Sequence, residues 1–297
     1  MNPVWSVVIP TRNRADCLRR CLLALAAQDY PRERFEVIVV DDGGSPGIEI
    51  GADLRKELEI ALIRQPRSGP AAARNRGASM ARGQFLAFTD DDCAPVPDWL
   101  SELERVLRSN PNALAGGRVL NALGGNPYST ASQLLIDYLC AEYTKDGQPR
   151  FLTSNNLALA RGAFLQLGGF DESFRRAAAE DRAFSEHWRS NGGDLRYVKG
   201  PVVHHTHDLT LAGFLRQHFG YGRGARHFHQ VCRRNGWGRI TMEPLRFYFG
   251  LIAFPLTAGS TGRISPPWLS ALLLVSQVAT ATGYAFEAIR ARPRRTD

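Results

Sequence analysis

Three apolar runs that alternate with helical segments constrain the fold of this chain more than any other feature. The runs cover residues 4–9, 35–40 and 85–89. Apolar residues recur at helical spacing in 16–28, and 70–82 are Ala-rich and helical up to Gly83. Strands that are apolar on both faces and alternate with helices are typical of a parallel sheet covered by helices. The chain is therefore predicted to be an α/β protein.

Polar side chains follow each of these three predicted strands. Residues 11–14 follow the first, Asp41 and Asp42 end the second, and residues 90–92 end the third. Ligands of such sheets bind beyond the carboxyl ends of the strands. The three polar ends are therefore expected to converge on one binding crevice.

The third of these ends carries three consecutive carboxylates, Asp90, Asp91 and Asp92. Like charges pinned to the end of a buried strand repel one another and call for a cation. A hard divalent ion such as Mg²⁺ or Mn²⁺ takes oxygen ligands and is often shared with substrate phosphates. The alternative is a solvated acidic turn before the next helix.

Charge and cysteine usage limit the compartment and the partners. The chain has 297 residues and a formal charge of +8, with much of the excess in 216–239 and at Arg290–Arg295. Such an excess fits an anionic lipid, a nucleic acid or a phosphorylated substrate. Five widely spaced cysteines form no disulfide framework and no zinc spacing, and no signal peptide is recognised. A reducing, cytoplasmic compartment is expected.

The last eighty residues differ in character from the rest. Residues 245–256 are apolar and aromatic, and 268–289 contain Glu287 as their one charged residue. A membrane span needs about 20 apolar residues, so the second segment just qualifies. It is expected to lie on or dip into a membrane, or else to form a helical hairpin packed on the preceding α/β domain or on a second subunit.

Several motifs, taken in order, resemble family 2 glycosyltransferases of the GT-A fold. They are SVVIPTRNR (6–14), VVDDG (39–43), GPAAARNRG (69–77), TDDD (89–92), NNLALARGAFLQLGGFD (155–171) and the pair Glu180-Asp181. The resemblance covers about residues 4–210. It implies a GT-A catalytic domain at 1–213, with a donor nucleotide-binding half (1–120) and an acceptor half (121–213). Residues 214–297 are then a C-terminal helical, membrane-associating region.

The resemblance implies inverting sugar transfer from a nucleotide-diphospho-sugar, with a UDP-sugar favoured and Mg²⁺ or Mn²⁺ as cofactor. The sequence lacks the Gln-x-x-Arg-Trp signature of processive synthases, which favours transfer of a single sugar. A metal that bridges the diphosphate stabilises the charge of the leaving group. Asp92 is the expected metal ligand, and Asp90 reaches the ribose or the metal through water. Asp91 faces the sugar or supports its neighbours. The remaining donor-binding residues are expected to be Pro10, Thr11, Arg14, Asp42, Arg74 and Arg223.

Asp42 is expected to accept a hydrogen bond from the nucleotide base, with a simple turn as the alternative. Arg76 is expected to lie on an exposed helix face.

The acceptor hydroxyl needs a general base that takes its proton in the transition state. By resemblance this base is Asp181, with Glu180 as the fallback. A histidine after the acceptor helix is implied as a further metal or diphosphate ligand, either His204 or His207. For Arg223 the alternative is a basic surface that faces lipid headgroups.

The expected acceptor is a saccharide, a lipid-linked glycan precursor or another hydroxyl compound at the cytoplasmic face of the cell membrane. No nucleic-acid partner is expected, and a homo-oligomer through the C-terminal helices is an open alternative. Two rival functions are a nucleotidyltransferase and a non-catalytic GT-A-like binding subunit. The first fits poorly because residues 10–14 contain no glycine.

Overall fold

The computed structural model describes residues 3–144, 149–176, 178–237, 243–257 and 264–290. The chain divides into two compact units. Unit 1 comprises Met1–Leu120, Asp146–Arg175 and Asp181–Thr206, and unit 2 comprises Asn121–Lys145, Arg176–Glu180 and His207–Asp297. These limits differ from the predicted boundary after residue 213. The division into donor and acceptor halves remains a prediction.

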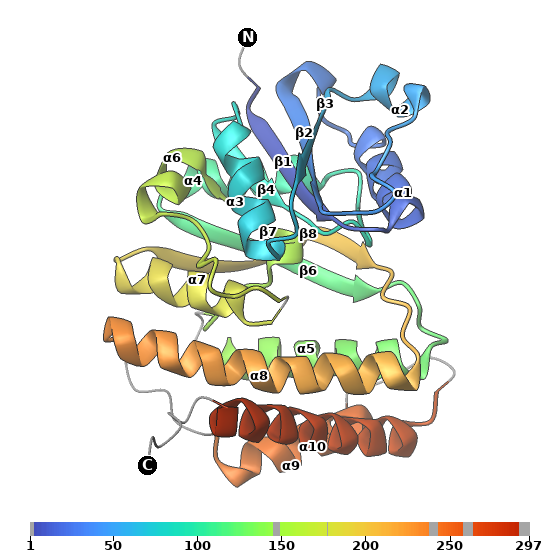
Figure 1. Ribbon diagram of the computed structural model, residues 1–297, viewed down its shortest axis with the longest axis vertical. Helices are drawn as coiled ribbons and strands as arrows, with labels where there is room; N and C mark the ends of the chain where they lie inside the picture. The colour runs from blue at the N-terminus through green and yellow to red at the C-terminus, as the bar shows by residue number, and fades with distance from the viewer. Residues whose placement is uncertain (1–2, 145–148, 177, 238–242, 258–263, 291–297) are drawn as a thin grey trace, which may run out of the picture. The chain divides into compact units, whose positions relative to one another are not determined.

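Unit 1 is built on one mixed sheet of eight strands in the order β3-β2-β1-β4-β7-β6-β8-β5 (Figure 1). The strands are β1 (Trp5–Thr11), β2 (Phe35–Asp42), β3 (Ile60–Gln65), β4 (Phe85–Phe88), β5 (Cys93–Pro95), β6 (Ala113–Asn121), β7 (Leu157–Ala160) and β8 (Asp194–His205). β1, β2, β3 and β4 run parallel, and β7 pairs antiparallel with β4. The α/β prediction is confirmed, and β2, β1 and β4 lie side by side.

Helices cover both faces of this sheet because alternate strand residues point to opposite sides. The helices and short 3₁₀ turns around the sheet are α1 (Ala15–Ala26), η1 (Arg32–Arg34), α2 (Ala52–Glu57), α3 (Pro70–Met80), α4 (Trp99–Ser109), η2 (Ser154–Asn156), α6 (Arg161–Leu167) and α7 (Glu180–Ser190). Val7 and Ile9 pack in one core with residues of α1 and α4. Val8 packs in a second core with residues of α3, α6 and α7. Unit 1 therefore has three layers.

β8 and β5 complete the sheet near the end of unit 1. β8 runs unbroken over Asp194–His205. β5, with only three residues, was not predicted, and it pairs antiparallel with the end of β8. Three residues carry too little periodicity to mark a strand, but the pairing brings β8 against the turn that follows β4.

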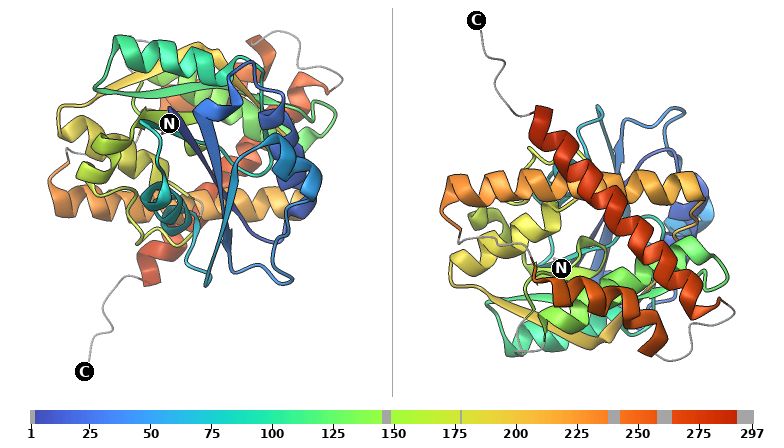
Figure 2. Two further views of the ribbon diagram at one scale, coloured as in Figure 1. Left: turned by 90° about the horizontal axis from the view of Figure 1, so that it is seen from above. Right: turned by 90° about the horizontal axis from the view of Figure 1, so that it is seen from below.

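Unit 2 is helical. It contains α5 (Pro127–Tyr143), α8 (Leu211–Asn235), α9 (Leu245–Thr257) and α10 (Pro266–Arg290). Figure 2 shows α10 running across α8, and the two are packed against each other. By length and composition, α10 is the one described helix that could cross a membrane, with a mean hydropathy of 1.4 over its most apolar window. The arginines of 292–295 lie outside the described residues.

Candidate active site

The three carboxylates of Asp90, Asp91 and Asp92 lie in the turn between β4 and β5. Asp91 is fully buried and Asp92 is 8% exposed. Buried carboxylates need positive partners or hydrogen-bond donors, since water no longer solvates them. Each of the three has an arginine beside it, which rules out a simple solvated turn.

Asp91 joins the ends of β1 and β4. Its Oδ2 accepts a 2.7 Å hydrogen bond from the Thr11 hydroxyl, and its Oδ1 lies 2.6 Å from Nη2 of Arg14. Burial raises the pKa of Asp91 to about 7, although the Arg14 charge opposes this. The predicted convergence of the first and third strand ends is thus present in the fold. Asp91 holds Thr11 and Arg14 in place.

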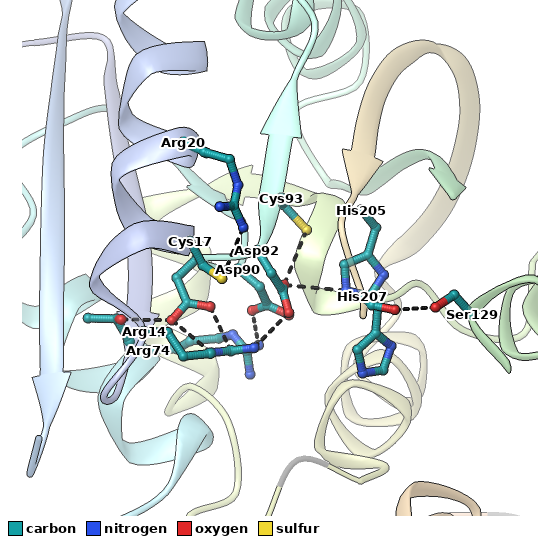
Figure 3. Close-up of polar contacts among 12 residues, drawn as sticks. Arg14, Cys17, Arg20, Arg74, Asp90, Asp92, Cys93, Ser129, His205 and His207 are labelled. Atoms are coloured by element: carbon teal, nitrogen blue, oxygen red, sulfur yellow. Dashed lines mark hydrogen bonds and ion pairs between the residues drawn. The ribbon is translucent and has the colours of Figure 1, made fainter. Parts of the chain in front are cut away.

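Asp92 lies between an arginine and a histidine. Nη1 of Arg14 lies 2.7 Å from one of its carboxylate oxygens, and Nε2 of His205 lies 3.3 Å from the other (Figure 3). Burial disfavours a charged imidazole, but the Asp92 carboxylate outweighs it and raises the pKa of His205. The ligand atoms of Asp92, Cys93 and His205 lie within 4.8 Å of one another.

The three histidines of 204–207 are placed differently. His205 pairs with Cys93 across the β5–β8 ladder, and His204 pairs with Ala94. Paired positions share a face and neighbours alternate, so His204 is on the opposite face from His205 and is exposed. His207 belongs to unit 2, where its carbonyl oxygen accepts a hydrogen bond from Ser129. The structure brings His205, and not His204, to Asp92.

Asp90 faces a buried arginine from α3. Nη2 of Arg74 lies 2.6 Å from Asp90 Oδ1, and the Arg74 side chain is 3% exposed. Its guanidinium also lies over the Phe170 ring, 5.8 Å from the centroid. Two positions along the same helix, Arg76 is exposed, as expected of a surface residue. Arg74 is therefore a cation built into the site.

Asp42 and Asp41 organise the loops after β2 and β3. The Asp42 carboxylate accepts hydrogen bonds from Gln65 Nε2 and from the backbone amides of Ser68 and Gly69, at 2.7–2.9 Å. Asp41 likewise accepts from the amides of Gly44 and Ile48. Asp42 thereby fixes the entry into α3. Its contact with a nucleotide base remains a prediction.

Pro10 lies buried in β1, where it pairs with Val40 of β2. This register places it one residue before Thr11, whose hydroxyl reaches Asp91. Pro10 thus lies at the end of β1, where the site forms. Its role in lining a nucleotide pocket remains a prediction.

Asp181 lies in the first turn of α7. Burial raises the pKa of its carboxyl, while the charges of Arg182 and Arg74 and a backbone hydrogen bond from Ser154 oppose the shift. The Arg182 amide donates to Asp181 Oδ1 at 2.8 Å. Arg74 therefore acts electrostatically on both Asp90 and Asp181. Glu180, the alternative base, is buried.

Arg223 has a partner within unit 2. Its Nε lies 2.5 Å from Oε2 of Glu287, which joins α8 to α10. The side chain is 18% exposed, and its guanidinium stacks over Phe286. In the structure, the Arg223 charge is engaged by this ion pair. The expected contact of Arg223 with a donor diphosphate remains a prediction.

Comparison with known proteins identifies the family. A sequence profile of Glycosyl transferase family 2 matches residues 6–168, more than half of the chain. The chain is 30% identical over 290 residues to validoxylamine A glucosyltransferase of Streptomyces hygroscopicus subsp. jinggangensis, covering 82% of this chain and 68% of that protein. The chain therefore belongs to glycosyltransferase family 2.

Two further comparisons show how much of a longer relative the chain covers and which fold it has. The chain is 39% identical over 121 residues to the glycosyltransferase AglE of Haloferax volcanii, which is 39% of this chain and 40% of that protein. It thus spans well under two thirds of that relative's length. The mannosyltransferase PcManGT from Pyrobaculum calidifontis, solved with GDP-Man and Mn2+, matches with a TM-score of 0.61 and 20% identity. The match covers 98% of this chain and 80% of that one, which confirms the GT-A fold.

Proposed function

We propose that the chain is an inverting, metal-dependent glycosyltransferase that moves one sugar from a nucleotide-diphosphate donor to a hydroxyl acceptor. The observation that carries the proposal is the gathering of Asp90, Asp91 and Asp92 with Arg14, Arg74 and His205 beside the ends of the parallel strands β1 and β4. Relatives named as glycosyltransferases support the same reaction class.

The side chains present fit a divalent metal. Asp92 offers carboxylate oxygens and His205 an imidazole nitrogen 3.3 Å away. Carboxylate oxygens suit both Mn²⁺ and Mg²⁺, and the His205 nitrogen would add a further donor. When bound, such an ion would neutralise the charge that develops on the leaving diphosphate. Asp92 and His205 would hold it, with Asp90 beside them.

The arginines have a separate part in the reaction. Arg14 and Arg74 carry permanent positive charge where the diphosphate would leave, and each is already fixed by a carboxylate. Preorganised charges stabilise a developing negative charge without reorganising during the reaction. Arg74 thereby favours departure of the nucleotide, and Arg14 holds the acidic turn in position.

Asp181 is proposed as the base that takes the proton from the acceptor hydroxyl. Its carboxyl lies in a poorly solvated position that raises its pKa, which strengthens it as a proton acceptor. Attack from the side opposite the leaving nucleotide inverts the anomeric centre. Glu180 would contact the acceptor.

The donor is proposed to be a UDP-sugar, and the acceptor a lipid-linked or cell-surface glycan precursor at the cytoplasmic side of the membrane. The apolar helix α10 supports a membrane location. A nucleotidyltransferase remains the rival enzyme, and a non-catalytic binding subunit the rival without chemistry.

A thermal-shift screen followed by a transfer assay tests the proposal. UDP- and GDP-sugars are offered with Mn²⁺, with Mg²⁺ and with EDTA. We expect one nucleotide-sugar to raise the melting temperature only with metal, and release of its nucleoside diphosphate upon addition of acceptor. Formation of pyrophosphate from a nucleoside triphosphate would indicate the nucleotidyltransferase, and binding without turnover of any donor would indicate the binding subunit.

A further inference from the structure

α10 presents an apolar side outward and turns its polar groups inward. Trp268, Val278 and Ile289 are 50%, 60% and 68% exposed. The other exposed positions that continue this stripe along the described helix are Ala271, Leu274, Val275, Ala281, Thr282, Ala285 and Phe286. Until Arg290 at its end, no exposed residue of α10 is charged. A water-facing helix side has the opposite composition.

The polar groups of α10 are directed at α8. Glu287 forms the ion pair with Arg223, and the Thr280 hydroxyl donates to the backbone carbonyl of His218 at 3.2 Å. The two backbones lie very close. A Cβ atom added at Gly222 would overlap the Thr280 carbonyl oxygen, and one at Gly283 would overlap the Phe219 carbonyl oxygen. α10 is therefore held closely against α8 where the two helices cross.

α9 extends the apolar surface within the same unit. Leu245, Phe249 and Leu256 are 76%, 71% and 60% exposed, and α9 packs on α10. Monomeric proteins rarely leave so many large apolar side chains together in water. We call the outward residues of α9 and α10 the α9–α10 face.

Positive charge accompanies the α9–α10 face. Arg246 and Arg290 are exposed near its ends. The sequence continues with three more arginines, Arg292, Arg294 and Arg295. Apolar side chains combined with arginines and without exposed acids match an anionic bilayer, where basic residues attract the headgroups and apolar ones enter the boundary. Trp268 is also of the type enriched at such interfaces.

We propose that the α9–α10 face binds the surface of an anionic bilayer, with α10 lying along the membrane instead of crossing it. The inference deepens the membrane association proposed above and does not depend on the sugar-transfer chemistry. It names the lipid class and the side chains that enter the bilayer.

The packing of α10 on α8 argues against a span. α8 carries charged or titratable side chains along its length, among them Arg216, Arg223, Arg226, Arg233 and Arg234. If α10 crossed the bilayer while held to α8, these arginines would be drawn into the hydrocarbon, which is costly. Lying along the surface buries the outward stripe and leaves α8 outside the hydrocarbon.

Vesicle sedimentation of the full chain tests the proposal. One set of vesicles is pure phosphatidylcholine and the other contains about one third phosphatidylglycerol. We expect at least about tenfold stronger binding to the anionic vesicles, weakened by salt. Val278→Asp and Phe249→Asp should each reduce this binding several-fold. Met80→Asp, at a position 51% exposed on α3 of unit 1, is the matched control and should bind as the parent chain does.

Trp268 reports the depth of insertion. Quenching by lipids brominated at shallow acyl positions should exceed quenching by deeply brominated ones, and Trp268→Phe should remove the difference. Retention in the membrane pellet after alkaline carbonate extraction would show a span and overturn the proposal. A dimer in sedimentation equilibrium that Val278→Asp dissociates, without vesicle binding, would assign the face to a second copy.

Sugar transfer to a soluble acceptor in detergent separates this proposal from the proposed function. Val278→Asp should keep that transfer while losing vesicle binding. Full vesicle binding by a chain that transfers no sugar would refute the proposed function but would still support membrane binding by the α9–α10 face. Equal binding to both kinds of vesicle would overturn the role of the anionic headgroup.

Discussion

The Arg74 guanidinium lies 2.6 Å from the Asp90 carboxylate, and its charge partly opposes the rise that burial causes in the pKa of Asp181. One buried cation thus acts on a residue of the acidic turn and on the proposed base. Asp90 follows β4 and Asp181 lies in the first turn of α7, so Arg74 couples parts of the chain about ninety residues apart.

Arg74→Ala should reduce transfer by roughly 10²-fold or more, because a preorganised charge near the leaving diphosphate is lost. Steady-state kinetics with a saturating acceptor measure the effect. Arg76→Ala is the control, since it removes an exposed arginine from the same helix. Equal losses in the two variants would contradict a specific role for Arg74.

Asp181→Asn should lower the transfer rate by roughly 10²–10⁴-fold while donor binding is retained, because the amide cannot accept the proton. In the parent chain the rate should fall as pH drops through the Asp181 pKa, which burial raises above its ordinary value. The residual activity of Asp181→Asn should lack this acidic limb. If Glu180→Gln removes the limb instead, the base is Glu180.

His205→Ala should weaken Mn²⁺-dependent binding of the nucleoside diphosphate by at least about tenfold. Substitution of a residue that only hydrogen-bonds to a metal ligand already lowers metal affinity by about tenfold or more. Loss of a ligand itself should lower it at least as much. Calorimetry with and without Mn²⁺ checks this. His204→Ala removes an exposed histidine from the opposite strand face and should leave the affinity unchanged. A larger loss in His204→Ala would restore the assignment made from sequence.

His204 and His205 mark the boundary between what the sequence predicts and what only the structure shows. Apolar runs with polar ends were enough to predict β1, β2 and β4 and the meeting of Thr11 with the acidic turn. The choice among the clustered histidines depends on the register of β5 against β8. β5 has only three residues, so its pairing of Cys93 with His205 leaves no pattern in the sequence.

The same limit applies to Arg223. An arginine in a basic, glycine-containing segment reads equally well as a phosphate ligand or a lipid-facing residue. Its partner Glu287 is 64 residues further along the chain, on the helix that packs against α8. Only the fold shows that the charge holds two helices together.

Buried His218 should make the stability of unit 2 depend on pH. The side chain is fully buried beside the Phe214 ring, with Nε2 3.2 Å from the Ser132 hydroxyl. Burial, with a smaller contribution from His207, lowers its pKa from 6.5 to about 4. Between these values the unfolded chain binds the proton and the folded chain does not. The free energy of unfolding should therefore fall as pH drops below about 6.5, by at most about 1.4 kcal/mol per pH unit.

Urea unfolding of the full chain between pH 5 and 7.5 measures this slope. His218→Phe keeps an aromatic ring beside Phe214 and removes the titrating group, so its unfolding free energy should vary less with pH in this interval. The test compares how steeply the unfolding free energy changes with pH in the parent chain and in the variant. A difference in their absolute stabilities therefore does not affect it. His204→Gln, which removes an exposed histidine, should keep the parental slope. A parental slope in His218→Phe would mean that another group causes the acid sensitivity.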